Sequence, residues 1–330
     1  MSKFFISHEK CATGLSTMSP ISISEDNPYQ TLLTETNNDA AQLQARYETH
    51  RVNRNAQQTA KILADDFPGW NLDEILMCLD GPTKEDGYVD PRNCLVIWAK
   101  PPPRIRELIA FVQRELREVA PTLWLMPSDN LHTTVLEIAH SLTEEQIESM
   151  VRKLQSSKDV SAEQIADYTF AHCTRLVKPM VSFDAAAMAL SFVPAAGEGS
   201  DAQHSPDDDR YSYHHLRRDV FEMVRDAGIP VASRYSVPSA HLTIARFITL
   251  DGFTAKEEGG LVEIDRSQVR LLVEKIEAIN RKLQSEYWPR EDGTILAGGE
   301  WHVGEERGLV IQKGRLWYGD GQTVQIGKGY

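Results

Sequence analysis

The segment HTTV at residues 132–135 decides the fold, because its pattern of His-x-Thr before an apolar residue recurs as HLTI at residues 241–244. Both segments lie in runs rich in Val, Ile, Leu and Thr, which are typical of β-strands. Side chains alternate across a strand with a period of two, so each histidine shares a face with the threonine two positions later. The sequence therefore predicts two strands that present matched imidazole and hydroxyl groups.

These four side chains are suited to chemistry on a phosphate group if the two strands meet at one cleft. His132 and Thr134 would come from the first strand, and His241 and Thr243 from the second. One imidazole can take a proton from a nucleophile while the other protonates the leaving oxygen, and the hydroxyls can donate hydrogen bonds to non-bridging oxygens. An imidazole with a pKa near 6.5 serves in either role at neutral pH, so the sequence leaves open which histidine is acid and which is base.

Strands and helices alternate around each of the two motifs. Apolar residues at helical spacing, or in short continuous runs, indicate the following elements: a buried strand at 94–99, a helix at 104–119 after Pro103, a helix at 143–154, a strand at 181–193, helices at 211–227 and 267–287, and a closing hairpin at 309–326. Because each half contains strands and helices around one motif, we expect an α+β fold with two lobes.

Composition divides the chain into segments of different character. Residues 1–40 are rich in Ser, Thr, Asn, Asp and Gln, which is typical of a disordered tail. Helical periodicity over 41–92 predicts a helical N-terminal extension. The remaining residues, 93–330, form the expected bilobal domain, with a flexible insertion at 195–209, where large apolar residues are almost absent.

Charge and hydropathy restrict the class of partner. The formal net charge of −13 argues against extended contact with long duplex nucleic acid, because each phosphate contact needs local positive charge. A small anionic ligand stays compatible with basic groups gathered at one site. No secretory leader and no apolar run of roughly 18 residues is present, so we expect an intracellular protein, cytoplasmic or nuclear, with no membrane partner. The oligomeric state is left open.

The cysteines and carboxylates give no sign of a metal site. Cys11, Cys78, Cys94 and Cys173 are far apart, with no C-x-x-C pair and no zinc-ligand spacing. No cluster of carboxylates has the spacing of a divalent-cation site. We therefore expect no metal and no cofactor.

Two charged residues occupy the same offset after the two threonines. Glu137 follows Thr134, and Arg246 follows Thr243, by three positions. Strict alternation places both on the face opposite the histidines, so both are expected to be structural unless a β-bulge intervenes.

The loop before the second motif offers candidate substrate-binding residues. Arg234, Tyr235 and Ser239 lie in this loop, and an aromatic ring there can stack on a nucleobase. An ordinary exposed loop tyrosine fits the sequence equally well.

The similarity of this sequence to a known family is wider than the two motifs. VIWAKPP at 96–102, WLMPSDNLH at 124–132, and residues 240–247 and 308–324 resemble the two-histidine (2H) phosphoesterase superfamily. The resemblance implies two antiparallel sheets lining a central cleft with helices outside. It also implies that the two motif histidines are the acid and base, that the two motif threonines hold phosphoryl oxygens, and that no metal takes part.

The expected activity follows from this resemblance and from the paired motifs. It is metal-independent hydrolysis of a 2′,3′-cyclic phosphate, or a related phosphodiester, in a small nucleotide or a short RNA end. One alternative is RNA 3′-end trimming by transesterification, in which the substrate's own 2′-hydroxyl attacks. Another is a catalytically idle nucleotide- or RNA-binding module with the N-terminal helices as a docking arm, although an idle module has no chemical reason to keep both histidines and both threonines.

Overall fold

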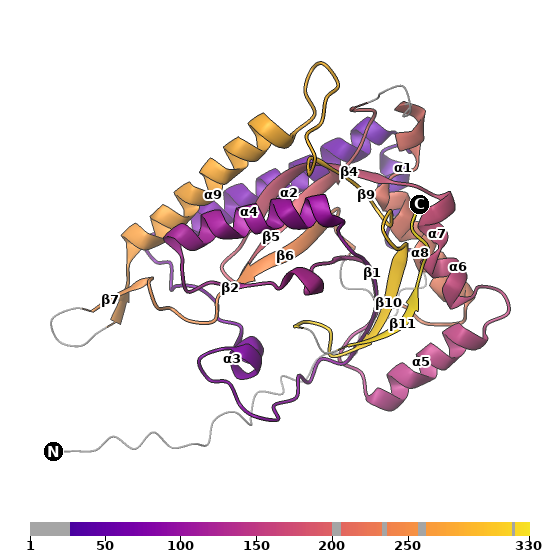
Figure 1. Cartoon of the computed structure of the whole chain (residues 1–330), viewed down its shortest axis with the longest axis horizontal. Coiled ribbons are helices and arrows are strands. Elements are labelled where there is room, and N and C mark those ends of the chain that lie inside the picture. Colours follow the sequence, from indigo (N-terminus) through magenta and orange to yellow (C-terminus); the bar gives the residue numbers. More distant parts are fainter. Residues whose placement is uncertain (1–26, 200–205, 233–235, 257–261, 319–320) are drawn as a thin grey trace.

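Two antiparallel β-sheets lie around the middle of the molecule, and helices lie outside them (Figure 1). The computed structural model describes residues 27–199, 206–232, 236–256, 262–318 and 321–330. Helices and strands are mixed along the chain, as the alternation of patterns predicted. The predicted α+β class with two antiparallel sheets is therefore confirmed.

The first sheet has the strand order β11-β10-β1-β3. Its members are β1 (Cys94–Ala99), β3 (Thr133–Ala139), β10 (Leu309–Gly314) and β11 (Gln322–Ile326). Every residue of β1 is buried, and the strand lies between β3 and β10 in the sheet. Strands β10 and β11 pair as the predicted C-terminal hairpin.

The second sheet has the order β2-β6-β5-β4-β9 and carries the second motif on an inner strand. Its members are β2 (Trp124–Leu125), β4 (Arg175–Phe183), β5 (Ala187–Pro194), β6 (Ala240–Arg246) and β9 (Glu300–His302). Strand β6 also contacts β3 of the first sheet, so the two motif strands are neighbours. A separate pair is formed by β7 (Thr254–Lys256) and β8 (Val262–Ile264).

Helices cover the outer faces of both sheets. Helix α4 (Pro103–Val119) starts with a proline in its first turn and packs against α9 (Arg266–Tyr287), which in turn lies on β4. The others on this core are α5 (Glu144–Ser156), α6 (Ala162–Ala166), α7 (Tyr168–Ala171), α8 (Tyr213–Asp226) and the 3₁₀ segments η1 (Ser128–Asn130) and η2 (Pro206–Arg210). Among the helices in the described part of the chain, none combines the length and apolar character that crossing a bilayer requires.

Residues 27–40, which composition assigned to a disordered tail, are instead folded onto the protein. They include α1 (Gln30–Glu35), and the side chains of Tyr29 and Leu33 are fully buried. The ring of Tyr29 meets Phe221 of α8 edge to face at 6.2 Å. Burying two large apolar side chains offsets the entropy of ordering this short polar segment. The rest of the predicted tail, residues 1–26, lies outside the described residues.

The N-terminal extension contains α2 (Ala40–Ile62) and α3 (Glu74–Asp80) and shares the main hydrophobic core. Helix α2 lies across β4 and β5 (Figure 1). Its polar side chains hydrogen-bond to strand carbonyls: Arg51 to that of Lys178 at 2.6 Å and Asn55 to that of Val181 at 3.0 Å. These contacts fix α2 against the second sheet.

Both ends of the predicted flexible insertion at 195–209 are anchored. Ala195 is buried, and the buried carboxylate of Asp209 forms an ion pair with Arg175 at 2.7 Å. The same carboxylate accepts a hydrogen bond from the backbone N–H of Gly197 at 2.7 Å. A buried ion pair that also satisfies a backbone donor holds both ends to β4, which composition alone does not reveal. Residues 200–205 lie outside the described residues.

Candidate active site

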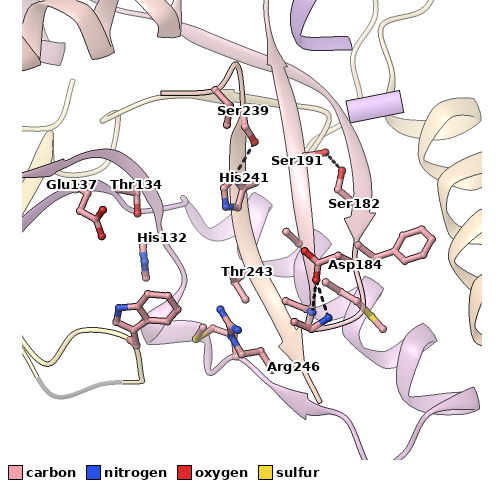
Figure 2. A pocket seen from close by; sticks show the side chains of 18 of the residues that line it. His132, Thr134, Glu137, Ser182, Asp184, Ser191, Ser239, His241, Thr243 and Arg246 are labelled. Atoms are coloured by element: carbon pink, nitrogen blue, oxygen red, sulfur yellow. Dashed lines mark hydrogen bonds between the residues drawn. The ribbon is translucent and has the colours of Figure 1, made fainter. Parts of the chain in front are cut away.

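The two H-x-T motifs line one cavity of about 360 Å³. His132 lies one residue before β3 and Thr134 lies within it, whereas His241 and Thr243 lie on β6. All four side chains border the cavity, with the first pair on one side and the second pair on the other (Figure 2). Two segments 109 positions apart in the sequence (241 − 132) thus meet at one site.

Strand β3 contains a β-bulge directly after its threonine. On the neighbouring strand β1, Ile97 and Trp98 are consecutive, but their partners Leu136 and Thr134 are separated by Val135. Val135 is therefore the extra residue, and the alternation of side chains is reversed beyond it.

Strand β6 contains a bulge at the equivalent place. Its neighbour β5 supplies the consecutive residues Met188 and Ala189, and their partners Ala245 and Thr243 are separated by Ile244. The threonine of each H-x-T motif is therefore followed directly by an inserted residue, and β3 has a second one, Ile138, beyond Glu137.

The expectation that Glu137 and Arg246 point away from the histidines is wrong, because of these bulges. Both side chains line the same cavity as the motif residues (Figure 2). Each half of the site thus has the pattern H-x-T-x-x-charge, with a carboxylate on β3 and a guanidinium on β6. Period-two counting cannot find either residue, since a bulge leaves no mark in these apolar runs.

His132 is held by a backbone carbonyl and an aromatic ring. Its Nδ1–H donates to the carbonyl oxygen of Asn130 at 2.6 Å, and its ring stacks on Trp98 with centroids 3.8 Å apart. Loss of hydration at the cavity wall lowers the pKa of His132 to about 3, with smaller lowering contributions from Lys100 and His241.

His241 is held by a hydroxyl and lies in the field of three arginines and of Asp184. Its Nδ1 lies 2.9 Å from the hydroxyl oxygen of Ser239, so this predicted loop residue contacts a motif histidine. Desolvation lowers the pKa of His241 to about 4, and the positive charges of Arg217, Arg54 and Arg246 add to the effect. The cavity therefore favours two neutral imidazoles at neutral pH.

The Nδ1 partners distinguish the tautomers that the two histidines can adopt. A carbonyl oxygen only accepts, so neutral His132 carries its proton on Nδ1 and keeps a free lone pair on Nε2. A hydroxyl can donate or accept, so His241 can carry a proton on Nε2 while Ser239 donates to its Nδ1.

Arg217 of α8 ties the two motifs together. Its Nε–H donates to the carbonyl of the bulge residue Val135 at 3.2 Å, and its Nη1 donates to the carbonyl of Val237, before His241, at 2.9 Å. A third bond reaches the hydroxyl of Tyr29 at 3.1 Å. A single buried guanidinium therefore fixes the relative position of the two halves of the site.

The guanidinium of Arg246 is oriented by the N-terminal extension. Its Nη1 lies 3.3 Å from a carboxylate oxygen of Asp73, which also accepts a hydrogen bond from the hydroxyl of Tyr318. The guanidinium lies 5.3 Å from the ring centroid of Trp317. Its buried Nε has no hydrogen-bond partner among the described residues. The guanidinium lines the cavity, and its positive charge is suited to attract an anion there.

The two threonine hydroxyls complete the donor set. Within the described residues, neither Thr134 nor Thr243 uses its side chain in a hydrogen bond to protein, so both hydroxyls stay free to donate to a bound group. Donors directed into one cavity from two strands favour an oxyanion there.

The other two loop residues proposed from sequence, Arg234 and Tyr235, lie outside the described residues. Sequence reasoning also missed His50 and Arg54 of α2, which line the cavity. No local signal marks them, because α2 reaches the site through tertiary packing. In the described part of the chain, no group of three or more His, Cys, Asp and Glu side chains is arranged to hold a metal ion.

Comparisons with known proteins give similarity of fold only. No protein-family model matches the chain, and no curated protein matches it. Among solved structures, TT0787 of Thermus thermophilus is similar at 11% identity and TM-score 0.34, over 71% of this chain and 96% of that one. The conserved protein of unknown function ATU0111 from Agrobacterium tumefaciens str. C58 is similar at 10% identity and TM-score 0.38, over 73% and 94%. Kluyveromyces marxianus Usb1 is similar at 11% identity and TM-score 0.31, over 71% and 98%. Similarities this weak assign no function, which must be inferred from the side chains in the cavity.

Proposed function

We propose that the chain is a phosphodiesterase of the two-histidine type, which uses His132 and His241 to open a 2′,3′-cyclic phosphate with water. The observation that carries this proposal is the meeting of both H-x-T motifs, with their free hydroxyls, at one cavity. Paired imidazoles suit acid–base catalysis, and the hydroxyls with Arg246 suit stabilisation of a phosphoryl group. No step of this chemistry requires a metal ion.

The hydrogen bonds on Nδ1 support different roles for the two histidines. His132, with a free Nε2 lone pair, acts as the base that accepts a proton from water. The water oxygen forms a bond to phosphorus while the bond from phosphorus to the leaving ribose oxygen breaks. For this step His241 is the imidazolium, whose Nδ1–H donates to the hydroxyl oxygen of Ser239. It donates its Nε2 proton to the leaving oxygen and becomes neutral, which gives a phosphate monoester and a hydroxyl group. Proton exchange with solvent then restores both histidines.

The low pKa of His241 is compatible with its role as acid. Arg217, Arg54 and Arg246 lower this pKa, and a bound phosphate opposes their positive charge. Substrate binding therefore raises the pKa of His241 and increases the fraction that carries the proton to be donated. Stacking on Trp98 restricts the ring of His132 before substrate arrives.

The cavity supports a small substrate. A volume of about 360 Å³ is near the lower end of the range for small-molecule sites and suits a nucleotide or the last residue of an RNA strand. The net charge of −13 opposes a long duplex. We therefore propose a small nucleotide or a short RNA end as the substrate.

The decisive test is turnover of adenosine 2′,3′-cyclic phosphate in the presence of EDTA. We expect His132→Ala and His241→Ala each to lower kcat by about 100-fold to 10,000-fold, the usual contribution of a general acid or base. His172→Ala, at a half-buried histidine outside the cavity, is the matched control and is expected to retain activity. A folded His132→Ala/His241→Ala double variant with full activity would disprove the proposal.

A substrate with an activated leaving group tests the assignment of base and acid. Bis(4-nitrophenyl) phosphate releases a nitrophenolate that needs no proton, so it does not depend on the general acid. We expect this substrate to restore much of the activity of His241→Ala and little of that of His132→Ala. The reverse pattern would exchange the two roles. Chromatography of products from a short RNA separates hydrolysis, which leaves a monoester, from transesterification, which leaves a cyclic phosphate.

A further inference from the structure

Helix α2 brings a second group of basic residues to the cavity. His50 and Arg54 are four positions apart on this helix, so they lie on one face, and both line the cavity wall. The charge of Arg54 lowers the pKa of His50 and of His241, so this guanidinium acts on the catalytic centre directly.

The surroundings of this part of the cavity are polar. Ser182 of β4, Asp184 just after this strand, and Ser191 of β5 lie on the side of His241 that is remote from His132 (Figure 2). The hydroxyls of Ser182 and Ser191 hydrogen-bond to each other at 2.9 Å.

The opposite part of the cavity is apolar. Cys94, Val96, Trp98 and Leu316 form a small hydrophobic cluster there, next to the ring of His132. The two catalytic histidines therefore lie between an apolar region and a basic, polar region. A substrate whose scissile phosphate lies between the histidines would extend in both directions.

Arg54 is free to bind an anion because it is not needed to hold α2 in place. Within the described residues its one hydrogen-bond partner is Asp184, at 2.6 Å, and the guanidinium side chain is 51% exposed. An exposed ion pair of this kind contributes little to stability. Asp184 is already engaged by the backbone N–H groups of Ala186 and Ala187, and α2 is fixed by bonds from Arg51 and from other polar residues of the helix.

We propose that Arg54, assisted by His50, forms a subsite for a second phosphate group, so that the preferred substrate carries a phosphate in addition to the one that is cleaved. This inference rests on the proposed phosphodiesterase function. A guanidinium with free N–H groups beside an imidazole suits a phosphate monoester, which accepts two parallel hydrogen bonds and carries up to two negative charges. A neutral sugar or base would need no such pair of basic groups.

The test compares two substrates that differ by one phosphate. These are adenosine 2′,3′-cyclic phosphate and its 5′-phosphorylated form, and the measured quantity is the ratio of their kcat/KM values. We expect the wild type to prefer the 5′-phosphorylated substrate by about tenfold or more, as a charge-assisted bidentate contact allows. In Arg54→Gln this ratio should fall towards one, whereas Arg54→Lys, which keeps the charge, should retain part of it.

Arg46→Gln is the matched control. Arg46 lies on the same helix and forms an exposed ion pair with Glu35, but it does not line the cavity. Its replacement should leave the ratio unchanged. A wild-type ratio near one, or an Arg54→Gln variant with the wild-type ratio, would overturn the subsite and leave the phosphodiesterase function standing. Failure of the wild type to cleave either substrate would instead overturn the function.

Binding gives an independent readout that does not depend on turnover. Calorimetric titration with adenosine 2′-monophosphate and adenosine 2′,5′-bisphosphate measures the contribution of the second phosphate to affinity. We expect the bisphosphate to bind the wild type at least about tenfold more tightly, and Arg54→Gln to lose this difference. Equal affinities of the wild type for both nucleotides would contradict the subsite.

Discussion

Four histidines that are held in their neutral form should make this fold unstable in mild acid. Desolvation is the main cause that lowers the pKa of His132 and His214 to about 3 and that of His215 and His241 to about 4, from an ordinary value of 6.5. Because the pKa values are lower in the folded state, the unfolded chain binds more protons as the pH falls below 6.5. Stability is therefore complete above pH 6.5 and is lost progressively towards pH 4.

The size of this loss at pH 5 depends mainly on the unfolded pKa. A histidine with a pKa of 6.5 in the unfolded chain and well below 5 in the fold costs about 2 kcal/mol at pH 5 relative to pH 7.5. Four such groups cost up to about 8 kcal/mol, and His132 and His241 contribute less than the two buried ones because they border the cavity. Typical folding free energies are about 5–15 kcal/mol, so this loss approaches the whole stability of the fold.

Urea unfolding at pH 7.5 and pH 5, for the wild type and for His214→Gln, measures this effect. His214 is fixed in its neutral form, because its Nδ1 accepts from the hydroxyl of Tyr47 at 2.8 Å and its Nε2–H donates to the carbonyl of Tyr29 at 2.9 Å. We expect the variant to be less stable at pH 7.5 but to lose about 2 kcal/mol less between the two pH values. The same pH dependence in both proteins would refute the reasoning.

Three further predictions concern the cavity. Arg246→Gln should lower kcat/KM for a cyclic phosphate by about 10-fold to 100-fold, mainly through KM, in steady-state assays. Thr134→Val and Thr243→Val should each lower kcat by about 100-fold, because each removes one hydrogen-bond donor to the oxyanion, and neither should change the temperature of thermal unfolding. A decrease in kcat of less than about twofold would show that the hydroxyls take no part in the mechanism. Binding of a nucleotide monophosphate should raise the pKa values of His132 and His241 in NMR titrations, since an added negative charge favours imidazolium, and unchanged values would place the anion elsewhere.

Local sequence signals predicted the elements that depend on local physics. The continuous apolar run of β1 marks a strand that is buried along its whole length. Pro103 at the first turn of α4, followed by an apolar stripe, marks a helix that packs on one face. The two motif strands were also predictable from local sequence, because the alternation of side chains before each bulge depends only on neighbouring residues.

The charged residues of the cavity were not predictable in the same way. Glu137 and Arg246 enter the cavity because Val135 and Ile244 are inserted between paired residues of the neighbouring strands. The position of a bulge depends on the register between two strands, which one strand's sequence does not specify.

Long-range packing explains the remaining errors. Tyr29 is buried against α8, which lies far later in the sequence, so polar composition gave a false indication of disorder. Arg54 reaches the cavity because α2 crosses β4 and β5. Such contacts join segments that carry no mutual signal in a single sequence, and only the assembled fold reveals them.

The two halves of the site have the same backbone geometry but different electrostatics. Each contributes a histidine, a threonine and a bulge, yet Nδ1 of His132 donates to the carbonyl of Asn130, whereas Nδ1 of His241 faces the hydroxyl of Ser239. In the proposed mechanism the carbonyl leaves Nε2 of His132 free to accept a proton, and the hydroxyl of Ser239 can accept from Nδ1 of a protonated His241 that gives up its Nε2 proton. Arg246 on β6 and Glu137 on β3, which occupy equivalent positions after the bulges, give the two halves opposite charges. The proposed roles, proton removal on the β3 side and proton delivery on the β6 side, therefore follow from different Nδ1 partners within one repeated strand pattern.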